Sequence, residues 1–414
     1  MFFFLILWCK FISFIQTPMA HQLNTQAGID AGSQKPLINR DFILITLSSF
    51  FFFFNYHSFV LLPIRIEDLG GSESIIGFIM GAASMATILS TPSVGILIDK
   101  WGKKWFLALG GLLMALTTLP FAYLDNLNLL FPVLRILQGA SLSLCFVSAG
   151  TLIADVASPG KRSQALGIFG MFSIMNFALA PYVGKIVVES FGFQDFFIFV
   201  CAFGLLSFLT AVLVKEPKTY AAENVEKSGF IKALFRKGVF QAAFVLMIAG
   251  TGFVTVITFI PVFALRINVA SFELFFLAYT LAVIAIRVLG GWIPDKYGHK
   301  RASIPALFLF SISIVGLSFS SDLSSLVLCG VLFGLSHGLL YPAIYALVID
   351  LTPESDRGKA VSICSVSFTF GGMLGVFSYG VLAELWGFHL MFAAAGVVCL
   401  LGSLIFAFTE SDGS

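Results

Sequence analysis

The sequence predicts an all-α membrane protein with twelve transmembrane helices in two six-helix bundles related by pseudo-symmetry. Its 414 residues are 58% hydrophobic and only 11% charged, whereas soluble domains carry about a quarter charged residues. Apolar runs of about 20 residues, the length that a helix needs to cross a bilayer, recur along the chain. Backbone groups in lipid must be satisfied within the segment, so we expect these runs to be helices. The second half also repeats the charged loops of the first.

Turn signals and charged residues divide the apolar sequence into twelve expected spans. They are 42–64, 73–98, 104–123, 128–154, 164–190, 193–214, 239–264, 271–293, 302–320, 324–350, 358–385 and 388–408. The longest polar interruption between spans falls after the sixth. The predicted organisation is therefore a leader at 1–41, an N-terminal bundle at 42–214, a linker at 215–238, a C-terminal bundle at 239–408 and a tail at 409–414.

The first 18 residues of the leader are unusual. Their apolar run stops at Lys10, which makes it too short to span a bilayer, and it lacks the basic start of a secretory signal. An ordinary polar segment begins at Met19. We hypothesise that translation starts at Met19, and the alternative is an interfacial segment. N-terminal sequencing of natively expressed protein decides, because Phe2 in the mature chain would exclude the hypothesis.

Lysines and arginines predict the orientation of the spans. They concentrate in the leader, the linker and the loops after even-numbered spans, whereas the other loops hold only Arg65 and Arg266. By the positive-inside rule, both termini face the cytoplasm of a multi-pass protein in the plasma or inner membrane. The net charge is +2 and the basic residues form no patch, so we expect no nucleic-acid partner. The six cysteines show no metal-ligand spacing, and neither a metal nor a cofactor is expected.

Two short charged stretches occupy equivalent loops, GILIDKWGKK from Gly95 and GWIPDKYGHK from Gly291. Their candidate gate residues are Gly95, Asp99, Lys100, Gly102, Lys103 and Lys104, and Gly291, Asp295, Lys296, Gly298 and Lys300. The first glycine of each is expected to let a neighbouring helix approach closely. Each aspartate can accept from a facing helix N-terminus or pair with an arginine, and each second glycine permits a turn with positive φ. The lysines lie at headgroup level.

Further spacings repeat between the halves and carry a family resemblance. Asp155 and Arg162 follow span four as Asp350 and Arg357 follow span ten. Span four also contains Arg-x-x-Gln-Gly, with Arg135, Gln138 and Gly139. These spacings and the two Gly-x-x-x-Asp loops give residues 40–408 a resemblance to the major facilitator superfamily. The resemblance implies transport by alternating access, with the two loops as a latch that closes the cytoplasmic side.

Two arginines within spans are candidates for substrate or proton coupling, because ionisable groups in lipid are costly. The resemblance associates Arg135 with proton transfer or substrate binding, and the alternative is an arginine that packs helices together. Arg287 is expected deep in span eight, and Thr91 stands at its counterpart in span two. That asymmetry favours recognition of a carboxylate or phosphate, because guanidinium pairs with both in a fixed fork. A structural role remains open.

Other polar residues in the spans are weaker candidates for the same role. His57 and His337 can titrate near neutral pH, although a hydrogen-bonded core histidine is the alternative for each. The resemblance places His337 opposite His57. Polar residues that could line a cavity are Asn55, Tyr56, Asn176, Thr251, Thr255, Tyr341, Tyr345 and Tyr379. Acidic residues of the spans, Glu73, Glu189, Glu273 and Glu384, all fall near expected outer ends. The lack of a carboxylate in mid-span weakens the prediction of proton coupling.

Span five carries part of a motif of drug–proton antiporters. The family motif is Gly-Pro-x-x-Gly-Gly, and this chain keeps Pro181 and Gly184 but has Ala180 and Lys185 at two of the glycines. Pro181 is expected to kink the helix as a moving gate, and Lys185 to reach the headgroups or attract an anion. The partial match favours efflux modestly.

The sequence therefore predicts a secondary transporter, not an enzyme, in the lipid bilayer. We expect proton-coupled efflux of a small organic solute, by a monomer. The alternative is uptake or facilitated transport of an organic anion or sugar by the same fold. No nucleotide-binding loop Gly-x4-Gly-Lys is present, so ATP is not expected to drive transport. The identity of the substrate depends on which side chains converge on the cavity.

Overall fold

The computed structural model describes residues 39–158, 161–216, 235, 237–353 and 356–409. The leader at 1–38, with the question of the start at Met19, lies outside the described residues. So do most of the predicted linker and the tail after Thr409. The account below concerns the compact unit that begins at Arg40.

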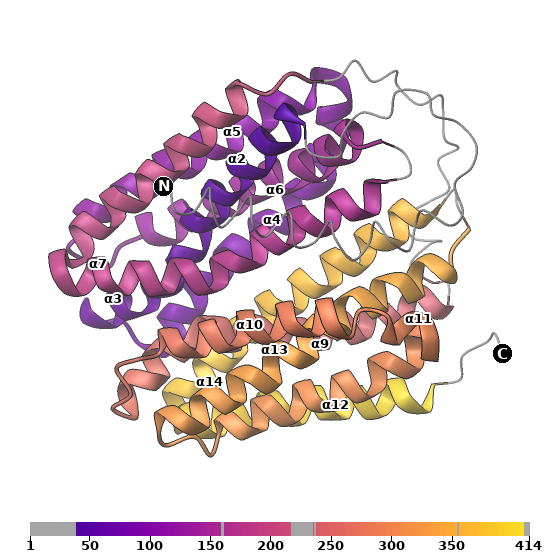
Figure 1. The fold of residues 1–414 in the computed structure, drawn as a ribbon. Helices are drawn as coiled ribbons and strands as arrows, with labels where there is room; N and C mark the ends of the chain where they lie inside the picture. Colours follow the sequence, from indigo (N-terminus) through magenta and orange to yellow (C-terminus); the bar gives the residue numbers. More distant parts are fainter. Residues whose placement is uncertain (1–38, 159–160, 217–234, 236, 354–355, 410–414) are drawn as a thin grey trace, which may run out of the picture. The chain divides into compact units, whose positions relative to one another are not determined.

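The N-terminal half consists of α-helices joined by short turns. They are α2 (Arg40–Ser58), η1 (Phe59–Leu61), α3 (Leu62–Asp68), α4 (Glu73–Trp101), α5 (Lys103–Thr118), η2 (Leu119–Tyr123), α6 (Leu130–Val156) and α7 (Arg162–Val212). The C-terminal half follows the same plan. It contains α9 (Lys237–Arg266), α10 (Glu273–Leu289), α11 (Ile293–Tyr297), α12 (His299–Leu317), α13 (Leu323–Asp350) and α14 (Arg357–Phe408). Figure 1 shows α2–α7 as one group and α9–α14 as another.

The helices agree with the predicted membrane fold. In the described part of the chain, nine helices are long and apolar enough to cross a membrane. Two of them, α7 with 51 residues and α14 with 52, are each long enough for two spans and are interrupted at Gly192 and Gly387, where φ is +84°. Helix α10 has 17 residues, which is at the lower limit of the length that crosses a bilayer. The breaks at equivalent glycines and the short α10 account for the twelve predicted spans.

One predicted span is wrong in its extent. Span eight was expected to run unbroken over 271–293, but α10 ends at Leu289 and a turn precedes α11. Pro294 stands in the first turn of α11, where a missing backbone N–H costs nothing. Span two has Ile98 at the equivalent place, and α4 continues to Trp101.

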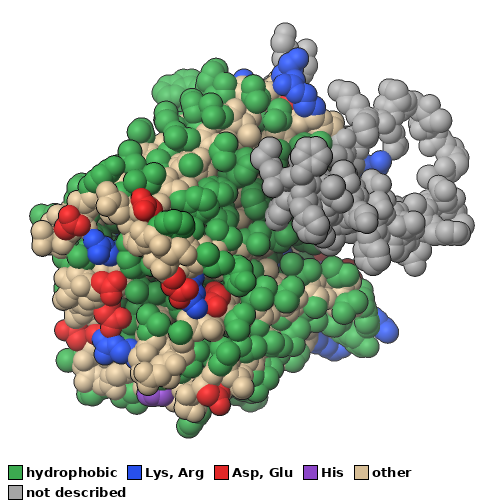
Figure 2. Space-filling view, turned by 60° about the vertical axis from the view of Figure 1, so that its left-hand side comes forward, with side chains coloured by type: hydrophobic (Ala, Val, Ile, Leu, Met, Phe, Trp, Pro, Cys, Tyr) green, Lys and Arg blue, Asp and Glu red, His purple; other side chains and the backbone are tan. Residues whose placement is uncertain are grey.

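Small residues bring helix backbones together within each half. A Cβ added to Gly139 of α6 would lie 2.0 Å from the carbonyl oxygen of Ala83 in α4. A Cβ added to Gly371 of α14 would lie 1.8 Å from the carbonyl oxygen of Met247 in α9. In a bilayer, where apolar burial gives no advantage over lipid, such close packing is a main source of helix association. Figure 2 shows the lipid-compatible exterior, on which hydrophobic side chains dominate; acidic side chains gather on the left of the view, and basic ones lie both there and on the right.

Candidate gates and substrate pathway

The two charged hairpins lie at one end of the bundle, which we call the loop end. Gly102 joins α4 to α5 with φ of +90°, and Gly298 joins α11 to α12 with φ of +93°. Positive φ is the conformation for which glycine is favoured. The predicted role of both glycines in the turn is confirmed. The other end, which carries Gly192 and Gly387, is called the opposite end below.

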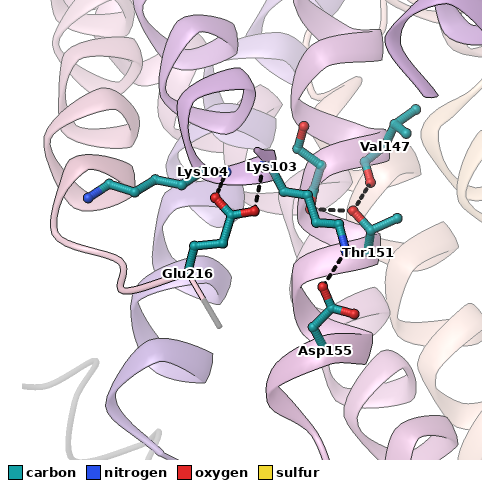
Figure 3. Close-up of polar contacts among 7 residues, drawn as sticks. Lys103, Lys104, Val147, Thr151, Asp155 and Glu216 are labelled. Carbon is teal, nitrogen blue, oxygen red and sulfur yellow. Dashed lines mark hydrogen bonds and ion pairs between the residues drawn. The ribbon is translucent and has the colours of Figure 1, made fainter. Parts of the chain in front are cut away.

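The residue that follows each hairpin glycine pairs with an aspartate, Asp155 or Asp350, whose spacing to an arginine is repeated in the two halves. Lys103 Nζ donates to Asp155 at 2.5 Å (Figure 3). In the other half, His299 Nδ1 lies 2.6 Å from Asp350 Oδ2. Each pair ties the start of one helix, α5 or α12, to the end of another, α6 or α13, in the same half. The pseudo-symmetry therefore extends from the sequence to individual contacts.

A residue of the predicted linker completes the N-terminal hairpin. The carboxylate of Glu216 accepts from the backbone N–H of Lys103 at 2.7 Å and of Lys104 at 3.1 Å (Figure 3). These donors are the unpaired N–H groups of the first turn of α5, and a negative charge there is favoured by the helix dipole. Local sequence patterns do not indicate this contact, because Glu216 lies more than a hundred residues from Lys103 and Lys104 in the chain.

Several expectations for the loop residues need correction. No neighbouring atom lies within 4 Å of a Cβ added to Gly95, so the expected close helix approach is absent there in this structure. Gly291 lies in the turn before α11, and its added Cβ would meet only the backbone of Arg287. Asp295 contacts His299 at 3.3 Å rather than an arginine or a facing helix. Asp99 lies in α4, but its side chain is outside the described set.

The loop lysines differ in their surroundings. Lys100 and Lys296 are exposed, and the ammonium of Lys296 lies 5.2 Å from the ring of Trp292. Lys104 lies 5.1 Å from the ring of Trp105, and Lys300 donates to the carbonyl of Thr409 at the end of the C-terminal half. These contacts suit the headgroup level, where cations and aromatic rings are both favoured.

Ion pairs cross between the two halves at the opposite end. Lys185 Nζ of α7 lies 2.8 Å from Glu273 Oε2 of α10, with side chains only 14% and 11% exposed. Arg266 of α9 donates through Nε to Glu67 at 2.7 Å and contacts Glu73 at 3.4 Å. Lys185 is therefore engaged in a buried pair, and the expected reach to the headgroups is wrong.

Backbones also meet across the halves at this end. A Cβ added to Gly77 of α4 would lie 2.3 Å from the carbonyl oxygen of Val376 in α14. The backbone N–H of Ser74 donates to Glu384 of α14 at 3.3 Å. At the loop end, by contrast, each hydrogen bond or ion pair identified between described residues joins two residues of one half. The structure is therefore closed between its halves at the opposite end.

Arg135 is buried in α6 and bound within its own half. Its Nη1 donates to Gln138 Oε1 at 2.7 Å, and its guanidinium lies 5.9 Å and 5.3 Å from the rings of Tyr56 and Phe59. Arg135 Nε and Gln138 Nε2 have no hydrogen-bond partner among described residues. The motif residues thus present unsatisfied donors, while Gly139 makes room for α4.

Arg287 lies in the last turn of α10 rather than deep within a span, because that helix ends at Leu289. Its buried Nε has no hydrogen-bond partner, and no ion pair to its guanidinium is found among the described residues. Thr91, its counterpart, instead bonds to Thr87 and Ser143 of its own half.

The two histidines lie on opposite sides of an aromatic contact between the halves. The ring of His57 packs 3.9 Å from Phe177, which lies 5.6 Å from Tyr279 and 6.1 Å from Phe253. His337 stacks on Phe253 at 4.5 Å, and its Nδ1 lies 3.0 Å from the hydroxyl of Tyr279. His337 therefore approaches His57 through intervening rings, not directly.

Asn55 has a structural environment. It is fully buried, donates to the carbonyl of Val200 at 2.7 Å and accepts from Thr118 at 3.0 Å, all in its own half. Tyr341 is half-buried, and its hydroxyl lies 2.8 Å from that of Tyr345, which in turn contacts Ser365. Tyr341 and Tyr345 therefore have the partial exposure of cavity residues, whereas Asn55 does not.

The partial motif of span five is tightly packed within the N-terminal half. Pro181 lies inside α7, and a Cβ added to Gly184 would lie 2.5 Å from Leu61 and 2.9 Å from Phe196. Gly184 is therefore a close-packing position near the sealed end. The expected kink at Pro181 stays a prediction.

The acidic residues lie near span ends, as the sequence predicts, but their partners could not be predicted from it. Glu73 and Glu273 begin α4 and α10, as their positions indicated. Their pairing with cations of the other half follows from the way that the two halves meet. A signal was available in charge balance, because Lys185 and Arg266 are cations on the side that is otherwise poor in them.

Two pseudo-symmetric bundles of membrane-spanning helices, sealed together at one end, define a membrane transporter. The sequence profile described as Major Facilitator Superfamily matches residues 42–293 and 264–413. The chain belongs to the major facilitator superfamily, and is a multi-pass membrane protein.

Relatives of this chain include efflux proteins. It is similar to the multi-drug resistance efflux pump PmrA of Streptococcus pneumoniae, with 28% identity over 83% of this chain and 89% of that protein. It is also similar to the staphylopine export protein of Staphylococcus aureus, with 23% identity over 86% and 93% of the two chains.

Solved structures confirm the fold. A bacterial homologue of the human lysosomal transporter Spinster, in an inward-facing and unoccupied conformation, matches with a TM-score of 0.75 and 14% identity over 90% of this chain and 97% of that chain. A variant of the nucleoside transporter NupG matches with a TM-score of 0.74 over 89% of this chain and the whole of the other.

Proposed function

We propose that this protein exports a small organic solute across the cell membrane by alternating access. The observation that carries the proposal is the arrangement of contacts between the halves. Ion pairs from Lys185 and Arg266 close the opposite end, whereas the loop-end pairs stay within each half. A transporter must close one side while the other is open, and contacts between the halves that are identified, among the described residues, at the opposite end correspond to one of two access states.

The orientation follows from the charges. With the lysine-rich loops in the cytoplasm, both termini face the cytoplasm and the described state faces inward. Substrate would then enter from the cytoplasm through the loop end. The division into bundles at 42–214 and 239–408, a monomer as the working unit, and a latch formed by the two hairpins in the outward-facing state are parts of the same proposal.

Export is favoured over uptake by the similarity to efflux proteins and by Pro181 and Gly184 of the partial antiporter motif. Proton antiport is the proposed energy source. Candidate coupling groups are Arg135, the two histidines and the acids of the opposite end. Uptake or facilitated transport of an organic anion is the second candidate, and the unpaired Arg287 supports it.

Transport into sealed vesicles tests the proposal. Fluorescent amphiphiles of positive, zero and negative charge are added outside everted membrane vesicles or proteoliposomes, with protein-free liposomes as the control, and a pH gradient is imposed and then collapsed. Antiport predicts accumulation that depends on an acidic interior and stops when the gradient collapses. Flux that is insensitive to the gradient indicates facilitated transport. The absence of flux for all probes, with protein shown to be folded and inserted, contradicts export of this class of solute.

A further inference from the structure

We infer that the C-terminal half holds a binding site for the anionic group of an amphiphilic aromatic solute, with Arg287 as its receptor. The inference rests on the proposed transport function and names the class of substrate. It starts from one feature: the guanidinium of Arg287, in the membrane region, has no hydrogen-bond or ion-pair partner among the described residues.

The cations of the described membrane region differ in whether an acid compensates them. Lys103 and Lys185, similarly shielded, each pair with a carboxylate, Asp155 and Glu273. Arg287 has neither an ion pair nor a hydrogen bond to its guanidinium among the described residues, and its buried Nε has no partner. An uncompensated charge in the membrane costs several kcal/mol. A ligand that carries an anion would supply the missing partner.

The direction of the Arg287 side chain is set by its helix. Side chains on an α-helix point toward its N-terminus, and α10 begins at the sealed opposite end. The guanidinium therefore extends from the last turn of α10 toward the middle of the membrane. Tyr279 lies two turns earlier on α10, and Tyr341 lies on α13, which packs against α10.

Aromatic rings continue from these tyrosines. Tyr341 lies 5.5 Å from Phe368 of α14 in an edge-on arrangement, and Phe368 lies 5.6 Å from Phe253 of α9. Tyr341 and Phe368 are half-buried, so part of each ring is accessible. Half-buried rings and a guanidinium on adjacent helices suit a ligand with an aromatic body and one carboxylate, because stacking and the charge-assisted hydrogen bond act together.

The pseudo-symmetric half lacks this arrangement. The counterpart Thr91 bonds to Thr87 and Ser143 and leaves no donor unpaired. Arg135 also has an unbonded Nε and no acidic partner among the described residues, but its Nη1 donates to Gln138 and its guanidinium lies over a ring of its own half. No such hydrogen bond or ring contact is identified for Arg287 in the described part of the chain. The site is therefore a property of one half, as a substrate-recognition site would be, and not a requirement of the repeated scaffold.

Three probes of one shape but different charge test the inference on the purified full chain in nanodiscs. They are 2-naphthoate, 2-naphthamide and 2-naphthylmethylamine, whose binding is read from naphthalene fluorescence. We expect 2-naphthoate to bind about ten-fold or more tightly than the other two. Equal binding of the three, binding of the amine alone, or binding of none overturns the inference without any variant.

Variants then assign the effect to Arg287. Arg287→Gln is expected to weaken 2-naphthoate binding by about ten- to hundred-fold and to leave 2-naphthamide binding unchanged. Arg287→Lys is expected to recover part of the loss, because it restores charge but not the fork. Arg301→Gln removes an exposed arginine of α12 and is the matched control, with no change expected. Unchanged 2-naphthoate binding in folded Arg287→Gln overturns the assignment.

The outcome separates this inference from the proposed function. In proteoliposomes, transport of the amine without binding of 2-naphthoate leaves an exporter standing and overturns the anion site. Binding of 2-naphthoate that depends on Arg287, without movement of any probe across the membrane, supports the anion site and contradicts export.

Discussion

The ion pair between Lys185 and Glu273 gives a sharp test of the seal between the halves. Glu273→Gln keeps the shape of the side chain and removes its charge. Lys185 then remains 14% exposed with only Glu189 nearby, at 3.6 Å, and that carboxylate is itself 62% exposed. The variant is therefore expected to destabilise the state in which the opposite end is closed.

The magnitude follows from the burial of the pair. Removing one partner of a buried pair costs about 3–5 kcal/mol, because the other charge is left uncompensated. Glu189 offsets part of that loss, so we expect about 2–3 kcal/mol here. In the open state both groups are hydrated and the substitution costs little. At about 1.4 kcal/mol per factor of ten, the ratio of open to closed molecules rises by about 30- to 150-fold.

Electron–electron distance measurements report this ratio. Spin labels at Asn126→Cys and Ser321→Cys lie on exposed loops of the two halves at the opposite end. The five cysteines in the described part of the chain are buried, which limits unwanted labelling. Cys9 is replaced by Ser. With Glu273 present, we expect mainly a short distance between the two spin labels. In Glu273→Gln we expect a longer distance between them to become dominant.

Two controls decide whether the pair itself is responsible. Lys185→Met combined with Glu273→Gln removes both charges and is expected to return the distances close to those of the unsubstituted protein. Glu384 lies at the same end and accepts an exposed hydrogen bond from Ser74, so Glu384→Gln should shift the distances far less than Glu273→Gln does. A distance distribution unchanged in Glu273→Gln, or equally changed in Glu384→Gln, refutes the reasoning.

Three further predictions concern the loop end and the packing. Asp99→Ala is expected to lower transport more than membrane abundance, and normal transport by correctly inserted protein refutes a latch. Gly139→Val places a side chain against the backbone of Ala83 and is expected to destabilise the protein by about 1–3 kcal/mol or more. Thermal unfolding measures this loss of stability. Gly150 has open space around it, so Gly150→Val is the control and should be nearly neutral. Glu216→Gln removes the charge at the start of α5 and should lower stability by about 1 kcal/mol, with a matching fall in unfolding temperature; an unchanged value contradicts the cap.

The positions of the turns could be predicted from the sequence, because they depend on local chemistry. Gly102 and Gly298 adopt positive φ as their place between charged residues indicated, and apolar length sets the spans. The break after Leu289 was missed, although Pro294 marks it. Proline restricts the residue before it, but its effect on a span depends on whether neighbouring helices satisfy the freed backbone.

The sequence by itself determined the class of this protein: spans, repeats and charged loops are local or periodic patterns that need no knowledge of distant contacts. Tertiary structure alone decided which charges meet. Lys185 pairs with Glu273 and Glu216 caps α5, whereas no described residue pairs with Arg287. The physical reason is that a charge in a bilayer is stabilised or left exposed according to groups within a few ångströms. Those groups come from helices far apart in the chain, and their meeting depends on how the two halves pack.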